Sequence, residues 1–324
     1  MTVVDGIELD TCKRNYNKEA IRNNEPIEEF LHVIMVISNP CNFKRRYKLA
    51  REFMMRMCQE EKIKLYIVEL CYGDQPFAIT ELNNPRHLQL RAEHPLWHKE
   101  NMINCGVTLL PKDWKAFAWI DADIEFESST WITDTLSILN GHSDIVQLFS
   151  HALDMDNDEL TMTVFNSGGY QYEKGNPVKN GPNFWHPGFA WAMTRKAYER
   201  IGGLYQYAIL GSGDNLIMWS LIKNVHKVID KNNTESYKNT IFKFQEKIYG
   251  LRFGYVPGVI RHFFHGKKIN RNYINRAQIL IKHNYDPVKH IKLGNGVITP
   301  TEEFPLGLLE DIMNYFRERN EDEL

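Results

Sequence analysis

The sequence lacks the features of several protein classes. Its five cysteines include no C-x-x-C pair, and an odd set of this kind predicts free, mostly buried thiols in a reducing compartment, not a disulfide framework. No apolar run approaches the roughly 18 residues that a membrane-spanning helix needs, and residues 1–30 are too polar for a signal peptide. We therefore expect a cytoplasmic protein without a membrane span.

An excess of charge of one sign is also missing. Lys and Arg number 39 against 41 Asp and Glu, which gives a formal net charge of -2 and no reason to expect a nucleic acid or an anionic membrane as partner. The sequence contains no G-x-x-x-x-G-K-[ST] and no H-E-x-x-H, which excludes a P-loop enzyme and a zincin-type protease. Residues 211–214 (G-S-G-D) lack the third glycine of a dinucleotide fingerprint.

Apolar runs of strand length alternate with helical patterns in the first part of the chain. Strands are predicted over 32–38, 63–70, 87–92 and 116–120, and helices over 47–58 and 97–109. This order predicts an α/β fold with a mostly parallel, doubly wound central sheet and helices on both faces. Ligands of such sheets bind at the carboxyl ends of the strands.

The rest of the chain is less regular. Residues 166–187 are rich in Gly, Asn and Pro and predict a long loop that closes over a site, and helices are expected near 272–283 and 305–319. The expected organisation is an N-terminal extension (1–30), a main domain that carries the site (31–265) and a helical C-terminal extension packed on it (266–324).

Two aspartates stand directly after the predicted strand 116–120. Asp121 and Asp123 would lie side by side at the edge of the sheet, where they repel each other unless a cation lies beside them. Hard oxygen ligands favour Mg²⁺ or Mn²⁺, although an aspartate that only caps the strand end is the simpler alternative. His262 and His265 lie among basic residues and suit the rim of a metal–phosphate site.

A second acidic cluster occupies residues 154–158. It resembles the start of an EF-hand loop, but its sixth and twelfth positions are Glu159 and Phe165, where that loop needs Gly and Glu. We therefore expect a solvated acidic loop here.

Several segments resemble, in the right order, motifs of the β-1,4-galactosyltransferase group of GT-A glycosyltransferases. They are residues 96–106, 121–123, 187–195, 202–215 and 259–262, and the tail with Arg271 and Arg276 is closer to family-2-like bacterial and viral enzymes. The resemblance covers about residues 31–285. It implies a GT-A (Rossmann-like) fold and inverting transfer of a hexose from a nucleotide sugar, expected to be UDP-linked, to a glycan or other hydroxyl acceptor, with Mn²⁺ or Mg²⁺.

The resemblance also assigns donor-binding residues. Trp97 takes the place of the aromatic residue that stacks on uracil, and Lys99 that of the arginine beside the nucleotide phosphates. Asp121 falls on the first aspartate of the family's D-V-D motif. Glu69 ends the second predicted strand, where GT-A enzymes often place an acid against the base or ribose.

For the metal, the resemblance implies Asp123 and His262 as ligands. Val259 stands where the family has a methionine ligand, so water or His265 would fill that position. Asp214 falls on the catalytic base and would deprotonate the acceptor hydroxyl, although an aspartate at a helix start is also explained as a cap.

Two other functions stay open. A sugar nucleotidyltransferase on a related fold would use the same metal carboxylates, but normally has a Gly-rich basic loop after its first strand, and residues 39–42 (N-P-C-N) contain no glycine. A non-catalytic carbohydrate-binding protein on the same fold would bind a glycan regardless of Mn²⁺ and UDP.

Overall fold

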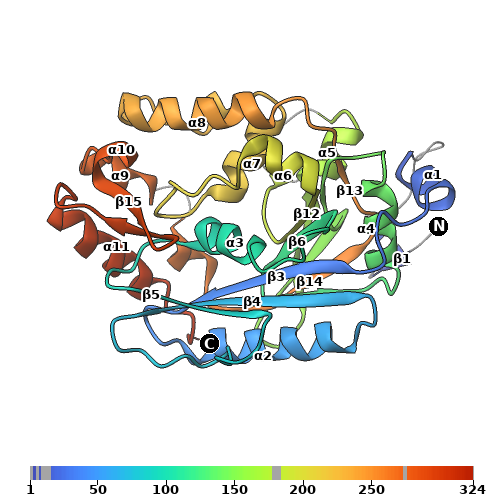
Figure 1. Ribbon diagram of the computed structural model, residues 1–324, viewed down its shortest axis with the longest axis horizontal. Coiled ribbons are helices and arrows are strands. Elements are labelled where there is room, and N and C mark those ends of the chain that lie inside the picture. The colour runs from blue at the N-terminus through green and yellow to red at the C-terminus, as the bar shows by residue number, and fades with distance from the viewer. Residues whose placement is uncertain (1–2, 5–6, 9–15, 177–183, 273–275, 324) are drawn as a thin grey trace.

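The computed structural model describes residues 3–4, 7–8, 16–176, 184–272 and 276–323. Its centre is a seven-stranded sheet with the order β13-β8-β12-β6-β3-β4-β5 (Figure 1). In that order the strands are Phe253–Tyr255, Ile145–Gln147, Ala190–Thr194, Ala116–Ile120, Leu31–Ser38, Ile63–Tyr72 and His87–Ala92. Every neighbouring pair is parallel except the two that β12 makes with β8 and β6, which confirms the mostly parallel α/β sheet.

Helices cover both faces of this sheet because its central strands are apolar on both sides. Val33 and Met35 of β3 belong to one core cluster with side chains of two helices, α2 (Lys44–Gln59) and α4 (Trp131–Leu139). Ile34 belongs to the other cluster, with side chains of α3 (Lys99–Val107), α6 (Arg195–Ile201), α7 (Gly213–Leu221) and α8 (Glu235–Ile248). Successive side chains of β3 thus point into the two core clusters in turn, which confirms the strand predicted from the apolar run.

A second sheet, with the order β11-β10-β9-β14-β7, brings distant segments together. Its strands are Trp185–His186, Thr161–Ser167, His151–Met155, Val259–His262 and Ile124–Phe126. β14 pairs with both β7 and β9, so that His262 lies opposite Ile124 on one side and Asp154 on the other. This register places the end of β14 beside Asp123, the residue before β7.

Two loop predictions are wrong. Asp154 lies in β9 and is buried, so the acidic cluster is not solvated throughout. Residues 166–187, expected to form one long loop, instead contain the end of β10, helix α5 (Gly168–Glu173) and β11, while their residues 177–183 lie outside the described part of the chain.

The C-terminal part contains more than the predicted helices. It consists of η2 (Lys268–Arg271), α9 (Ala277–Lys282), α10 (Pro287–His290), the hairpin strands β15 (Ile291–Gly294) and β16 (Val297–Pro300), and α11 (Leu306–Glu318). The hairpin turns at Asn295 and Gly296, whose φ values of 50° and 83° suit the Asn-Gly turn that favours hairpins. Beyond α11 the chain runs back to the start of α2, where Asp322 contacts Lys44 and Arg45 (Figure 1).

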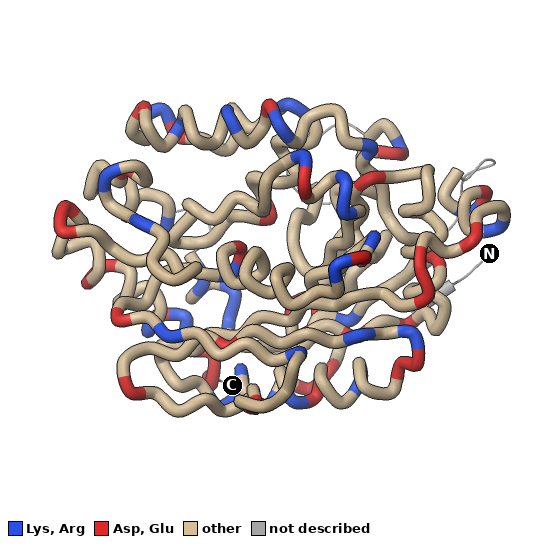
Figure 2. Tube along the Cα trace, viewed as in Figure 1, with Lys and Arg blue, Asp and Glu red and all other residues tan. Residues whose placement is uncertain are grey.

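The remaining elements are short. They are β1 (Val3–Val4), β2 (Ile7–Glu8), α1 (Tyr16–Asn23), which packs beside α4, and η1 (Val225–Lys227). Basic and acidic residues are mixed along the trace (Figure 2). Among the described residues, no helix combines the length and apolar character needed to cross a bilayer. Cys41, Cys58, Cys71 and Cys105 are free thiols, but of these four only Cys71 is buried, so the prediction that most of them are buried is wrong.

Candidate active site

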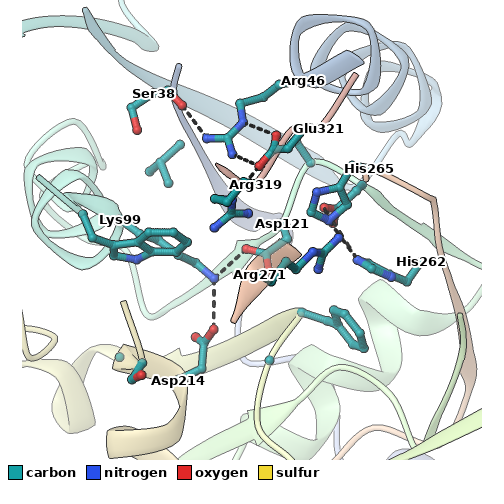
Figure 3. Close-up of a pocket in the computed structure, with 18 of the residues that line it drawn as sticks. Ser38, Arg46, Lys99, Asp121, Asp214, His262, His265, Arg271, Arg319 and Glu321 are labelled. Atoms are coloured by element: carbon teal, nitrogen blue, oxygen red, sulfur yellow. Dashed lines mark hydrogen bonds and ion pairs between the residues drawn. The ribbon is translucent and has the colours of Figure 1, made fainter. Parts of the chain in front are cut away.

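A pocket of about 520 Å³ lies where β3 and β6 end. Figure 3 shows its polar side chains converging from both halves of the chain. Of the residues singled out from the sequence, those that line it are Trp97, Lys99, Asp121, Asp123, Asp214, His262 and His265. The pocket therefore lies at the predicted edge of the sheet.

Three of these side chains form one possible metal-binding face. Nε2 of His265 lies 2.8 Å from Oδ2 of Asp123, and Nε2 of His262 lies 3.7 Å from the same oxygen and 3.2 Å from Nε2 of His265. Ligand atoms about 2.1 Å from an octahedral cation are about 3 Å apart, which matches these separations. Oδ1 of Asp123 is buried without a hydrogen-bond partner, so a cation would also satisfy an orphaned carboxylate oxygen.

Buried Asp154 orients His262. Its Oδ1 lies 2.7 Å from Nδ1 of His262, and its Oδ2 lies 2.5 Å from Nζ of Lys268. Burial alone would raise the pKa of Asp154, but the hydrogen bond with His262 and the charge of Lys268 hold it below its ordinary value. An ionised carboxylate only accepts hydrogen bonds, so Nδ1 carries the hydrogen and the lone pair of Nε2 faces the site. Histidine ligands of metals are commonly held in this way.

The ionisation states of His265 and Asp123 also suit metal ligands. Burial and the charge of Arg271 lower the pKa of His265 to about 4, which leaves it neutral at pH 7. Burial alone would raise the pKa of Asp123, but the neighbouring His265 and His262 hold it well below its ordinary value. A carboxylate and the Nε2 atoms of two imidazoles are thus available to a cation.

Lys99 links two carboxylates on the other side of the pocket. Its Nζ lies 2.6 Å from Oδ1 of Asp121 and 3.1 Å from Oδ2 of Asp214. Burial alone would lower the pKa of Lys99, but these two carboxylates raise it above its ordinary value, so the side chain stays charged. Asp214 is the second residue of α7, whose N-cap position is Ser212. The alternative that Asp214 is only an N-cap is therefore wrong, because its carboxylate binds Lys99 instead.

Glu100, next to Lys99 on α3, is a buried acid that no sequence pattern distinguishes. It lines the pocket with only 3% of its surface exposed. Burial, followed by the charge of Asp214, raises the pKa of Glu100 to about 8. One ammonium group cannot balance three neighbouring carboxylates, and Glu100 is the one that keeps its proton at pH 7.

The structure does not bring Glu69 into the site. Its carboxylate accepts hydrogen bonds from the backbone N–H groups of Ala78 and Thr80, both at 2.7 Å, and from the Thr80 hydroxyl at 2.6 Å. These contacts occupy both oxygens and fix the loop after β4. The predicted contact of Glu69 with the base or ribose is therefore wrong.

Trp97 lines the pocket, but side chains of the C-terminal part contact its ring. Phe316 stacks on it at 6.4 Å between ring centroids, and the guanidinium carbons of Arg319 and Arg276 lie 5.2 Å and 5.9 Å from its centre. The predicted stacking of Trp97 on a nucleobase stays a prediction.

The C-terminal part supplies site residues that sequence reasoning did not assign. The lining residues beyond position 265 are Lys268, Arg271, Arg276, Phe316, Arg319 and Glu321. Arg276 donates to Ser212 at 2.8 Å and to Tyr315 at 3.1 Å, which ties this part to the start of α7. The resemblance pointed to Arg271 and Arg276, whereas nothing in the sequence pattern distinguishes Arg319 or Glu321 from surface charges.

Comparison with known proteins finds similarity only in backbone structure. No protein-family model and no curated protein sequence matches the chain. A similar structure is the catalytic domain of Drosophila β1,4-galactosyltransferase 7 in complex with xylobiose, with 9% identity, 82% of this chain and 86% of that chain covered, and a TM-score of 0.41.

Two further solved structures are similar to the chain at comparably low sequence identity. The mannosyltransferase PcManGT from Pyrobaculum calidifontis, in complex with GDP-Man and Mn²⁺, has 11% identity, coverage of 83% and 67%, and a TM-score of 0.41. A putative nucleotide-diphospho-sugar transferase from Desulfovibrio desulfuricans has 11% identity, coverage of 89% and 97%, and a TM-score of 0.32. These names agree with the resemblance drawn from the sequence, but at such TM-scores the function has to be argued from the side chains.

Proposed function

We propose that this protein is a metal-dependent glycosyltransferase that moves a hexose from a nucleotide sugar, UDP-linked, to a hydroxyl group of a glycan or other acceptor. The observation that carries the proposal is the face formed by Asp123, His262 and His265, with His262 oriented by buried Asp154, in the same pocket as Asp214. A nucleotide-sugar transferase needs a cation site and a base in one pocket, and this arrangement provides candidates for both.

Asp123, His262 and His265 would hold Mn²⁺ or Mg²⁺. When bound, the ion supplies Lewis acidity that stabilises the charge developing on the leaving diphosphate. Lys268 and Arg271 line the pocket beside these side chains and add fixed positive charge for the same group.

Asp214 would take the proton of the acceptor hydroxyl. Lys99 engages its Oδ2, and we assign the proton to Oδ1. In Figure 3, Asp214 lies below the end of Lys99, whereas His262 lies to the right, beyond Asp121 and Arg271. A base facing the donor across the pocket suits a single displacement with inversion.

A panel of nucleotide sugars tests the proposal. Purified protein is incubated with Mn²⁺ and UDP-, GDP-, ADP- or CMP-linked sugars, with and without a mixture of mono- and disaccharide acceptors, and nucleotide release is measured. We expect release from a UDP-sugar that disappears in EDTA and in the Asp123→Asn variant, but not in Asp158→Asn, whose residue is exposed. No release from any donor contradicts the proposal.

The same assay separates the two rival functions. Pyrophosphate release from a nucleoside triphosphate and a sugar 1-phosphate would identify a nucleotidyltransferase. Glycan binding that neither Mn²⁺ nor UDP changes, without turnover, would identify a non-catalytic carbohydrate-binding protein.

A further inference from the structure

Residues that follow α11 form part of the pocket wall. Residues 319–323, here called the C-terminal strap, follow α11 and pass against the backbone of Gly266, the residue after His265. A Cβ atom on Gly266, which has φ of +89°, would lie 3.0 Å from both the Asn320 oxygen and the Glu321 Cα. The strap therefore lies directly beside the proposed metal ligands.

Glu321 joins two arginines at this wall. Its carboxylate accepts hydrogen bonds at 2.8 Å from Nε of Arg46 and at 2.8 Å from Nε of Arg319. Only 1% of its surface is exposed. Burial alone would raise the pKa of Glu321, but Arg46 and Arg319 hold it well below its ordinary value, so the group is a buried carboxylate between two cations.

Each arginine is also held to another part of the site. Nη1 of Arg46 donates at 2.7 Å to the carbonyl of Ser38, the last residue of β3, and Arg319 lies over the Trp97 ring. All of these residues line the pocket (Figure 3). Without a carboxylate between them, two guanidinium groups would repel each other and turn away from the pocket. Glu321 holds the two guanidinium groups together at the pocket wall, which Arg271 and Lys268 also line.

Two acids fix the strap from outside the pocket. Asp322 accepts hydrogen bonds from the backbone N–H groups of Lys44 at 3.0 Å and Arg45 at 2.8 Å, at the start of α2, where no side chain of the helix itself provides a cap. Negative charge stabilises a helix N-terminus. Glu323 pairs with Lys267 at 2.6 Å. The strap is thus bound to both α2 and the segment that follows His265.

We propose that Glu321 is a positioning residue that holds Arg46 and Arg319 toward the donor diphosphate, so that the C-terminal strap sets the affinity of the donor site. The proposal rests on the proposed function, because it takes the diphosphate of a nucleotide sugar as the ligand.

The test measures UDP binding by calorimetry in saturating Mn²⁺. Glu321→Gln keeps the size of the side chain but removes the charge that orients the two arginines, so we expect the dissociation constant for UDP to rise about tenfold or more. Glu318→Gln, three residues earlier at an exposed position of α11 and outside the pocket, is the matched control and should leave UDP binding unchanged. Arg319→Lys, which keeps the charge but loses the planar fork, should weaken UDP binding in the same direction.

Two further measurements separate positioning from folding. Mn²⁺ affinity without nucleotide and uridine binding should stay within about twofold of wild type in Glu321→Gln, because neither depends on contacts to the diphosphate. Weaker UDP binding accompanied by equal losses for Mn²⁺ and uridine would show general damage and overturn the proposal. A lower Tm with unchanged UDP affinity, or tighter UDP binding, would overturn it as well. If wild-type protein binds no UDP, the proposed function itself fails, which is a distinct result.

Discussion

Nζ of Lys99 lies 3.1 Å from Oδ2 of Asp214, so a half-buried ammonium group holds the side chain that we propose as the general base. The same ammonium group lies 2.6 Å from Asp121, which follows β6 directly. Lys99 thereby fixes the position of the proposed base relative to the proposed metal-binding edge of the sheet. Such positioning matters because a general base must reach the proton that it removes.

Asp214→Asn should separate chemistry from binding. The amide keeps the size of the side chain and an oxygen for Lys99, so folding and UDP affinity should change little. It cannot take the acceptor proton, and loss of a positioned general base costs about 10²–10⁴-fold in rate. Turnover and UDP calorimetry on the same preparation check this. Near-normal turnover, or parallel loss of UDP binding, would remove Asp214 from the role of base.

Asp154→Asn should weaken metal binding without touching a metal ligand. Asp154 holds Nδ1 of His262 at 2.7 Å, and loss of such an outer partner typically lowers metal affinity about 10–100-fold. Titration of Mn²⁺ by electron paramagnetic resonance measures the change. Asp158→Asn, four residues away in the exposed turn, is the control and should bind Mn²⁺ normally. Equal affinity in both variants would show that Asp154 does not orient a metal ligand.

Much of the sheet and part of the site could be predicted from the sequence. The strands β3, β4 and β6 are continuous apolar runs, which identify strands buried on both faces. Asp121 and Asp123 could be placed at the edge of the sheet because they follow the apolar run of β6 directly. These predictions succeeded because they depend only on local pattern and on the direction of parallel strands.

The errors depend on contacts between distant segments. Asp154 looked like one of several solvated acids, and only the pairing of β9 with β14 places it opposite His262. Glu69 ends a strand as Asp121 does, but the loop after β4 folds back and takes up its carboxylate. No periodicity marks Arg319 or Glu321, because their position follows from where α11 packs.

UDP binding should depend on the divalent cation. Without it, the carboxylates of Asp121 and Asp123 repel the diphosphate, whereas a cation bound at Asp123 reverses the local charge. We expect the dissociation constant of UDP to be at least about tenfold lower in Mn²⁺ than in EDTA, a difference of about 1.4 kcal/mol. Uridine, which lacks the phosphates, should bind equally in both conditions. Equal UDP affinity in EDTA would contradict a site in which the cation bridges protein and donor.

Glu100 should make the folded state less stable as pH rises. Burial raises the pKa of Glu100 from its ordinary value of 4.5 to about 8. Between these values the folded protein holds a proton that the unfolded chain has lost, so the free energy of unfolding falls with rising pH in this window. The groups that act on Glu100 are Lys99, Asp121 and Asp214. Burial also raises the pKa of Asp121, from 3.8 to about 6, so Asp121 adds to the same decline in the lower part of this window.

Glu100→Gln tests this dependence because it removes the titrating group and keeps the shape. Urea unfolding at pH 5, 6.5 and 8 should show that the free energy of unfolding declines less with rising pH in the variant than in wild type. The difference in favour of the variant should be largest at pH 8. Glu246→Gln, at an exposed position of α8, should follow the wild-type curve. The interpretation fails if the Glu100→Gln curve runs parallel to the wild-type curve.

Gly213→Ala should expose the close packing between α7 and Glu100. A Cβ atom on Gly213 would lie 2.0 Å from Oε1 and 2.2 Å from Cδ of Glu100, so one of the two buried groups has to move. Overpacking of this kind typically costs about 1–3 kcal/mol. In the Glu100→Ala background the obstacle is gone, and the cost of Gly213→Ala should fall by about 1 kcal/mol or more. Urea unfolding of the four proteins in this cycle gives the coupling free energy between the two positions.

Gly258→Ala, whose added Cβ would meet only Ser128 at 3.8 Å, is the control and should lower the free energy of unfolding by the same amount in both backgrounds. If Gly213→Ala also costs the same in both, Glu100 does not fill the space beside Gly213, and its carboxyl group is not held next to Asp214.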